Sequence, residues 1–265
     1  MTAAPTNPTW DPQRYLTYAG ERGRPFVDLL ARVEVEAPRT VVDLGCGPGN
    51  LTALLAERWP EASITGVDAD PSMIEAARAS AAAGRVRFEL ADLRDWLHSA
   101  APGSVDVLFS NATLQWVPGH LALVPALVAA LAPGGALAFQ VPGNMGEPSH
   151  TLRDEIASRP PYAAHASGAA NPSSHDPGEY LTALQDAGCT VDAWETTYLH
   201  VLTGDDPVFT WVSGTGARPV LQALPDDLRP RFVEEFKAAL REAYPAGPHG
   251  TVLPFRRVFA VARRG

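Results

Sequence analysis

Short apolar runs alternate with helical hydrophobic repeats along the first half of the chain. The runs predict strands at 40–44, 64–68, 86–90, 105–110 and 136–141. Between them, apolar residues recur every three or four positions, as they do on one face of a helix. A similar repeat follows Pro25, a residue suited to a first helical position, so we expect a helix to begin there. Strand–helix alternation of this kind predicts an α/β fold with a mostly parallel sheet covered on both faces.

The alternation breaks after Val141. Residues 142–178 are rich in Pro, Gly, Ser, Ala and His, which predicts an irregular excursion with a short helix near 150–158. Asp176 and Glu179 have the spacing of a capping box, so a helix is expected to follow. Strands are then predicted at 190–202 and 258–262, with a helical patch between them that contains Phe232, Phe236, Leu240 and Tyr244.

A glycine-rich stretch, DLGCGPGN, occupies residues 43–50 and follows the first predicted strand. Glycine adopts the backbone angles that let a loop approach a ligand closely. A dinucleotide loop has the pattern G-x-G-x-x-G, but Asn50 stands at its sixth position. The stretch also lacks the Gly-Lys-Ser/Thr of a P-loop. The pattern therefore indicates a nucleotide site of another kind.

Acidic or amide side chains stand at the ends of the predicted strands. These residues are Asp43, Asp68, Asp92 and Asn111. Ligands of open α/β sheets bind beyond the carboxyl ends of the strands. An acidic site without phosphate-binding groups suits a cationic ligand. Asp70, which precedes Pro71, is instead predicted to cap a helix.

This D-x-G-x-G-x-G pattern, with acidic residues after the next two strands and LAPGG before the fifth, resembles the class I S-adenosylmethionine-dependent methyltransferases. The resemblance implies S-adenosyl-L-methionine as cofactor. It also implies a Rossmann-like, doubly wound, seven-stranded sheet with an antiparallel last strand and a helical cap. It implies a ribose contact at Asp68 and an adenine contact at Asp92. The full set of expected cofactor-binding residues is Asp43, Gly45, Cys46, Gly47, Asn50, Asp68, Ala69, Asp92, Leu93 and Asn111.

The implied organisation has six segments. A lid segment is expected at 1–35 and the cofactor-binding core at 36–141. Cap excursions are expected at 142–178 and 204–250, with a core helix and strand at 179–203 between them and a final core strand at 251–265.

Stretches outside the glycine loop narrow the resemblance. Residues 10–33, 110–120, 139–155 and 253–264 are similar to the trans-aconitate 2-methyltransferase family, whose pattern often differs at Gly20 and Met145. The resemblance implies that one carboxylate of trans-aconitate is converted to a methyl ester. A carboxylate is already ionised at neutral pH, so positioning and desolvation are expected to suffice and no catalytic general base is predicted.

The substrate's remaining carboxylates require cationic or hydrogen-bonding partners, and arginine suits them best. The candidate substrate-binding residues are Tyr15, Arg22, Trp116, His150, Arg153, Trp211, Arg218 and Arg256. For each arginine a solvated surface position is the alternative interpretation, and for each tryptophan a position in the core.

Composition restricts the function further. A net charge of −9 without a long Lys/Arg run argues against nucleic acid as a partner and for a small polycarboxylate held in a local cationic pocket. Two distant cysteines and scattered histidines predict neither disulfides nor a metal site. No signal pattern or apolar span is evident, so we expect a cytoplasmic protein outside the membrane. The oligomeric state stays open, and a monomer is compatible with the sequence.

Three alternatives remain at this point. The acceptor could be another small acid or a malonyl thioester on acyl carrier protein, although the acidic net charge disfavours docking to that acidic carrier. The chain could be a nicotinamide-dependent oxidoreductase, against which Asn50 and the lack of a Tyr-x-x-x-Lys motif argue. It could also be a regulatory protein that binds S-adenosylmethionine without catalysis.

Overall fold

The computed structural model describes the backbone of residues 19–265 and the side chains of that range except those of residues 19, 21, 22 and 81. The described chain divides into two compact units. We call residues 19–143, 174–196 and 257–265 the sheet unit, and residues 144–173 and 197–256 the helical unit. The functional roles predicted for the lid and cap segments stay predictions.

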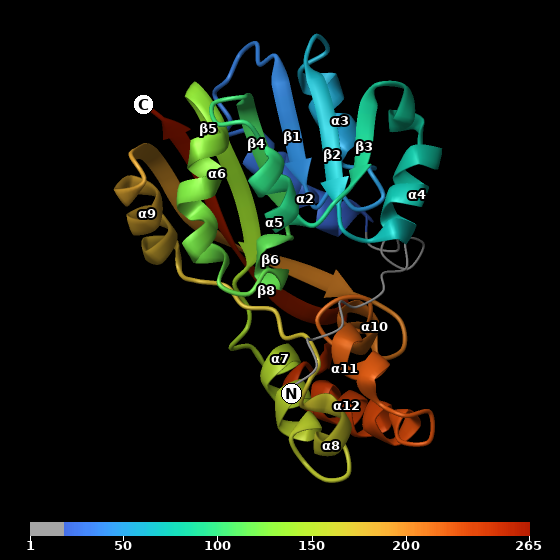
Figure 1. Ribbon diagram of the computed structural model, residues 1–265. Helices are drawn as coiled ribbons and strands as arrows, with labels where there is room; N and C mark the ends of the chain where they lie inside the picture. The colour runs from blue at the N-terminus through green and yellow to red at the C-terminus, as the bar shows by residue number, and fades with distance from the viewer. Residues whose placement is uncertain (1–18) are drawn as a thin grey trace. The chain divides into compact units, whose positions relative to one another are not determined.

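The sheet has the strand order β3-β2-β1-β4-β5-β8-β6 (Figure 1). Strands β1 to β5 pair in parallel, whereas β8 runs antiparallel to β5. The predicted Rossmann-like arrangement with an antiparallel last strand is therefore confirmed. A short strand, β7, pairs with β8 and was not predicted. The strand bounds are β1 Thr40–Leu44, β2 Ser63–Asp68, β3 Val86–Leu90, β4 Val105–Asn111, β5 Leu131–Pro142, β6 Cys189–Leu202, β7 Ala246–Gly247 and β8 Gly250–Arg264.

Both faces of the sheet in the sheet unit are covered by helices, because successive side chains of a strand point to opposite faces. Leu44, Leu108 and Phe139 belong to a buried cluster that includes side chains of α5 (Leu93–Ser99), α6 (Val124–Ala130) and α9 (Pro177–Asp186). These helices lie in front of the sheet in Figure 1. On the other face, Phe26 of α2 (Ala19–Leu30) packs on Phe109, with 4.6 Å between the ring centroids.

Helices α3 (Thr52–Arg58) and α4 (Pro71–Ala79) follow β1 and β2. Asp70 caps α4 as predicted, because its Oδ1 accepts hydrogen bonds from Ser72 N at 2.8 Å and Met73 N at 3.3 Å. The capping box of α9 is also present, and Glu179 accepts a hydrogen bond from Asp176 N at 3.1 Å. Local capping signals therefore predicted both helix starts correctly.

The helical unit contains five helices among the described residues. They are α7 Pro148–Ala157, α8 Ala163–Ala166, α10 Pro207–Ser213, α11 Arg218–Ala223 and α12 Arg229–Ala243. The predicted helical patch corresponds to α12, which buries Phe232, Phe236 and Leu240. Its apolar side chains recur with the helical period, so the pattern alone was sufficient.

Three predicted boundaries were wrong. Strand β5 begins at Leu131, five residues before the predicted 136–141. Helix α2 begins at Ala19 and contains Pro25, which we expected at its first position. Proline is frequent at helix starts, and the apolar repeat before it is weak, so the sequence favoured the wrong residue. Strand β8 begins at Gly250, eight residues before the predicted 258–262. Its first half alternates buried and more exposed residues, but Pro254 and two arginines obscure the pattern.

Candidate functional site

The glycine loop lies at the carboxyl end of β1 in the sheet unit. The backbone N–H groups of Gly45 and Cys46 both donate to Val67 O, at 2.7 and 3.0 Å, which fixes the loop against the end of β2. The loop glycines Gly45, Gly47 and Gly49 have φ values of 79°, 55° and 77°. This left-handed region is costly for residues with a Cβ, so the conformation explains the three glycines.

The three glycines differ in what surrounds them. A Cβ on Gly45 would lie 1.9 Å from Thr113 Oγ1, and one on Gly49 would lie 2.7 Å from the Phe88 ring. A Cβ on Gly47 would have no heavy atom within 4 Å. Gly45 and Gly49 therefore serve close packing, whereas Gly47 exposes its backbone to open space where a ligand can approach.

Asp68 stands beside this open position, at the end of β2. Its Oδ2 accepts a hydrogen bond from Gly47 N, and its Oδ1 accepts one from Asp70 N, both at 2.9 Å. Each carboxylate oxygen can accept more than one hydrogen bond, so capacity for ribose hydroxyl groups remains. Burial raises the pKa of Asp68, against the opposing effect of these backbone hydrogen bonds. The two anchoring bonds hold the carboxylate in one orientation.

Asp43 is more deeply buried than Asp68. Asp43 is only 2 % exposed, and its Oδ2 accepts a hydrogen bond from Thr52 Oγ1 at 2.6 Å. Burial raises the pKa of Asp43 to about 7, although the Thr52 hydrogen bond acts in the opposite direction. Burial also raises the pKa of the Cys46 thiol, so this cysteine is protonated and suits packing within the loop. A positive charge brought near Asp43 would favour its ionised form.

Asp92 is exposed and has a structural role. Its Oδ1 accepts a hydrogen bond from Arg94 N at 2.8 Å, which caps the start of α5. The next residue, Leu93, is buried in the sheet core. Ala69 is exposed after Asp68, and Asn50 is half-buried at the end of the loop. The cofactor contacts predicted for these four residues stay predictions.

Asn111 ends β4 and belongs to a hydrogen-bonded chain that the sequence did not reveal. Its Oδ1 accepts a hydrogen bond from Gln140 Nε2 at 2.6 Å, and Gln140 Oε1 accepts one from Arg257 Nη1 at 3.3 Å. Asn111 and Gln140 are register partners of β4 and β5, and Pro142 pairs with Arg257 across β5 and β8. These two hydrogen bonds fix the orientation of the Asn111 amide. Only the strand register, which is not local in sequence, could have shown that Gln140 and Arg257 join Asn111.

Trp116 is the candidate substrate residue of the sheet unit whose side chain the structure describes. Trp116 is half-buried in a 3-10 turn, Leu114–Trp116, that follows β4. Tyr15 lies outside the described residues, and the side chain of Arg22 does as well. Their predicted roles as substrate contacts stay predictions.

His150 and Arg153 lie close together on α7 in the helical unit. Both are buried, with exposed fractions of 7 and 2 %. Arg153 Nε donates to Asp154 Oδ1 and Nη2 donates to Asn171 Oδ1, both at 2.7 Å, and Nη1 donates to Gly216 O. Burial and, to a smaller degree, the charge of Arg153 lower the pKa of His150 to about 4. The imidazole is therefore neutral at pH 7.

The other candidate substrate residues of the helical unit are Trp211, Arg218 and Arg256, and each lies on a different element. Trp211 is almost fully buried and stacks on His200, with 4.6 Å between the ring centroids. Arg218 opens α11 and is half-buried, and Arg256 is half-buried in β8. A core position accounts for Trp211, and its role as a pocket wall stays a prediction, as do the roles of both arginines.

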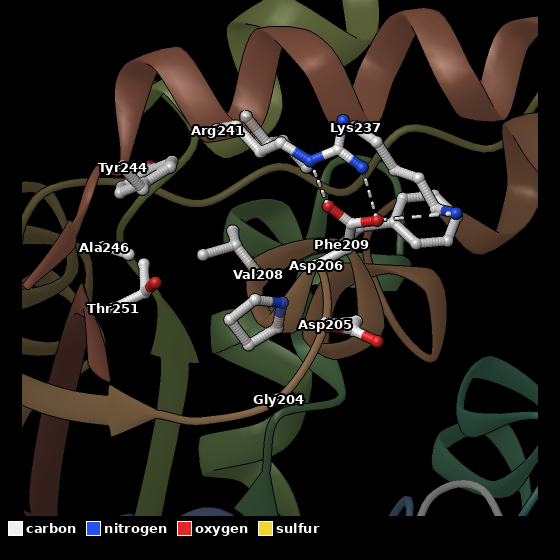
Figure 2. Close-up of a pocket in the computed structure, with 12 residues that line it drawn as sticks. Gly204, Asp205, Asp206, Val208, Phe209, Lys237, Arg241, Tyr244, Ala246 and Thr251 are labelled. Carbon is white, nitrogen blue, oxygen red and sulfur yellow. Dashed lines mark hydrogen bonds and ion pairs between the residues drawn. The ribbon is translucent and has the colours of Figure 1, made fainter. Parts of the chain in front are cut away.

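The helical unit also contains a cavity of about 700 Å³, shown in Figure 2. Among the described residues, none of the predicted site residues lines it. Arg241 and Lys237 point toward the Asp206 carboxylate, and Arg241 binds it through two hydrogen bonds of 2.5 and 2.7 Å. Hydrogen bonding from Arg241 lowers the pKa of Asp206. Because the two cations already face a carboxylate, this cavity is a weaker candidate for an anionic substrate.

No helix in residues 19–265 is both long enough and apolar enough to cross a membrane. Within the same part of the chain, no group of three or more His, Cys, Asp or Glu side chains is arranged to hold a metal ion.

Comparison with known proteins identifies relatives over nearly the whole chain. A family model described as a methyltransferase domain matches residues 41–135, which include the glycine loop and the acidic strand ends. A trans-aconitate 2-methyltransferase of Streptomyces coelicolor is 53 % identical over 98 % of this chain and 88 % of its own length. Another, of Mycobacterium sp. strain KMS, is 49 % identical over 97 % of this chain and 100 % of its own length.

Solved structures agree on the fold. The YcgJ protein of Bacillus subtilis superimposes with a TM-score of 0.60, over 91 % of this chain and 98 % of its own, at 13 % identity. At this low identity the likeness supports the α/β architecture alone.

Proposed function

Because the chain belongs to the trans-aconitate 2-methyltransferase family, we propose that it methylates one carboxylate of a small polycarboxylic acid, with trans-aconitate as the first candidate. The observation that carries the proposal is the 53 % identity to a relative of that name over 98 % of this chain. The similarity includes the helical unit and is not confined to the methyltransferase domain at 41–135.

The cofactor is S-adenosyl-L-methionine. We propose that the glycine loop and the carboxylates at the strand ends hold it. The backbone at Gly47 faces open space, so a ligand can approach it without meeting a side chain. Asp68 holds a carboxylate at the same position for ribose hydroxyl groups. Asp43 adds a second acidic group, which suits a ligand with a sulfonium and an ammonium group.

Bound S-adenosylmethionine supplies an electrophilic methyl group, which a carboxylate oxygen accepts to form a monomethyl ester. The acceptor is already an anion at neutral pH, so no protein group needs to remove a proton. The protein's contribution is then to orient the acid, to exclude water and to balance its remaining charges. Trp116, Arg153, Arg218 and Arg256 are the described residues that we propose for orienting and charge-balancing roles, with Tyr15 and Arg22 from the sequence.

The net charge of −9, without a long basic run, supports a small acid over nucleic acid as the partner. A basic face for docking an acyl carrier protein is likewise not favoured by this charge. The cytoplasmic location and the monomeric state that the sequence allows stay predictions.

A labelling experiment tests the proposal. The protein is incubated with methyl-labelled S-adenosylmethionine and a panel of trans-aconitate, cis-aconitate, isocitrate and a simple monocarboxylate. We expect label in a base-labile ester of trans-aconitate, with less in the other acids. Binding of S-adenosylhomocysteine without turnover on any acid would support a regulatory protein instead. Binding of NADH in place of S-adenosylhomocysteine would contradict both readings.

A further inference from the structure

The hydrogen bonds that join Asn111, Gln140 and Arg257, which we call the amide relay, have a fixed direction. An amide side chain donates through its nitrogen and accepts through its oxygen, whereas an arginine guanidinium only donates. Arg257 Nη1 donates to Gln140 Oε1 at 3.3 Å. The nitrogen of the Gln140 amide is thereby turned toward Asn111, and it donates to Asn111 Oδ1 at 2.6 Å. The cation at one end of the relay therefore determines how both amides are oriented.

Asn111 presents its nitrogen beyond the relay. Its Oδ1 is bound to Gln140, so Nδ2 points away from Gln140. Within residues 19–265 no acceptor is bonded to this nitrogen, and it is not one of the polar atoms buried without a partner, so solvent reaches it. The Asn144 amide of the helical unit differs, because both of its ends are buried without a partner. Asn111 is thus an oriented and accessible hydrogen-bond donor.

Asn111 lies next to the glycine loop in the sheet unit. Ser110 Oγ donates to Leu44 O at 2.9 Å, and Thr113 Oγ1 donates to Gly45 O at 3.4 Å. These contacts tie the residues before and after Asn111 to the end of β1. In the strand order, β1 lies between β4 and β2, the strand that ends in the carboxylate proposed for the ribose. A ligand that extends from that carboxylate across the loop therefore has its other end at β4.

The other end of S-adenosylmethionine is an amino acid with one ammonium and one carboxylate group. An ammonium only donates hydrogen bonds and cannot pair with the Asn111 N–H group, whereas a carboxylate accepts them. The surrounding charges have the same sense. Asp43 and Asp68 lie on the β1 and β2 side of Asn111, and Arg257, which is 6 % exposed, lies on the β8 side. An anion is therefore favoured toward β5 and β8, and a cation toward β1 and β2.

We propose that Asn111 binds the carboxylate of the amino-acid part of S-adenosylmethionine, and that Gln140 and Arg257 are positioning residues for this contact. The inference rests on the proposed placement of the cofactor at the glycine loop. It is independent of which acid accepts the methyl group. It adds Gln140 and Arg257 to the residues expected from the sequence.

Gln140→Glu reverses the relay with little change in volume. A glutamate beside Arg257 accepts on both sides, so Asn111 must turn Nδ2 toward residue 140 and Oδ1 toward the ligand. Calorimetric titration compares S-adenosylhomocysteine with 5′-methylthioadenosine, which has the same adenine and ribose but no amino-acid part. We expect Gln140→Glu to weaken S-adenosylhomocysteine binding about tenfold and to leave methylthioadenosine binding unchanged. Gln185→Glu adds the same charge at an exposed position of α9 and should bind both ligands like the wild type.

Asn111→Asp tests the same contact without replacing the more deeply buried Gln140. One aspartate oxygen still accepts from Gln140, and the other places a negative charge against the ligand carboxylate. S-adenosylhomocysteine affinity should again fall about tenfold, with methylthioadenosine unchanged. Stronger binding of S-adenosylhomocysteine would show that residue 111 faces the ammonium and would overturn the inference. An equal loss for both ligands would show a merely structural role and would overturn it as well.

Variants at position 257 test whether the relay's direction depends on the arginine. Arg257→Lys keeps a group that only donates, whereas Arg257→Gln introduces an amide that can also accept. We expect Arg257→Gln to weaken S-adenosylhomocysteine binding about tenfold, and Arg257→Lys to restore most of that affinity. Equal affinities in these two variants would contradict the positioning role of Arg257.

The wild-type titration separates this inference from the placement of the cofactor. Wild-type protein that binds neither ligand would refute the cofactor site itself. Wild-type binding of both ligands, with unchanged S-adenosylhomocysteine affinity in Gln140→Glu and Asn111→Asp, would refute the carboxylate contact alone.

Discussion

Gly47 and Gly134 offer a pair of substitutions that separates ligand contact from backbone strain. Gly47 has φ 55° and Gly134 has φ 75°, and a Cβ on either would have no heavy atom within 4 Å. Gly47 lies in the glycine loop, whereas Gly134 lies in the irregular first part of β5, where the register with β4 shifts. Alanine therefore introduces the same kind of backbone strain at both positions. Only Gly47 is expected to contact the cofactor.

The size of the strain follows from the backbone angles. A left-handed conformation costs an alanine roughly 1–2 kcal/mol. Replacing glycine also restricts the unfolded chain, which returns about 0.4–1 kcal/mol. Each variant should thus lower the free energy of unfolding by about 1 kcal/mol. Gly45→Ala should lower it further, since its Cβ would lie 1.9 Å from Thr113 Oγ1 and one of the two segments must move.

Calorimetric titration with S-adenosylhomocysteine and denaturant unfolding together provide the assay. We expect Gly47→Ala to weaken cofactor binding at least tenfold, equivalent to about 1.4 kcal/mol, because its methyl group occupies the space that the ligand needs. Gly134→Ala should bind like the wild type. Equal cofactor affinity in Gly47→Ala and Gly134→Ala would refute the assignment of the cofactor to the open side of the loop.

Three other perturbations test separate parts of the site. The pKa of Asp43 is raised to about 7 in the folded protein, so its contribution to stability is present at low pH and is lost as pH rises from about 4 through 7. A cationic cofactor favours the ionised form, and its affinity should rise with pH up to about 7 and level off above it. Asp43→Asn should flatten that profile, and a profile unchanged by Asp43→Asn would contradict the assignment. Arg153→Met should lower the free energy of unfolding by about 2–4 kcal/mol, because Asn171 and Gly216 lose their buried donor. Arg153→Lys should restore little of that stability, since lysine lacks the planar fork of arginine, and full recovery in a denaturant titration would count against this account. Gln140→Leu should cost about 1–3 kcal/mol by denaturant unfolding and should weaken cofactor binding, because Asn111 Oδ1 loses its partner. Unchanged cofactor affinity in Gln140→Leu would show that the orientation of Asn111 is unimportant.

The sheet and its ligand-facing end could be predicted because their signals are local. Each strand is a short apolar run, and the glycine loop and Asp68 follow strands directly in the sequence. The capping residue Asp70 was recognisable for the same reason, since its hydrogen-bond donors are only two and three residues away. These features depend on backbone geometry within a few residues, which composition and spacing determine.

Features that depend on distant segments were not predictable. Gln140 orients Asn111 only because β4 and β5 pair in one register. Thr113 requires glycine at position 45 because the two segments pack together in the folded chain. Helices α10 and α11 have seven and six residues, which is too short for a clear apolar period. The unpaired side chain of Asn144 likewise has no signature in the sequence, because burial and hydrogen bonding are properties of the packed structure.

A single-turnover experiment tests the central claim most directly. The protein, in excess over S-adenosylmethionine with a deuterated methyl group, is mixed with trans-aconitate, and the products are identified by mass spectrometry. The account predicts one equivalent of S-adenosylhomocysteine and one equivalent of a base-labile trans-aconitate ester that carries the deuterated methyl group. Release of S-adenosylhomocysteine without a labelled ester, or no consumption of S-adenosylmethionine, would contradict it.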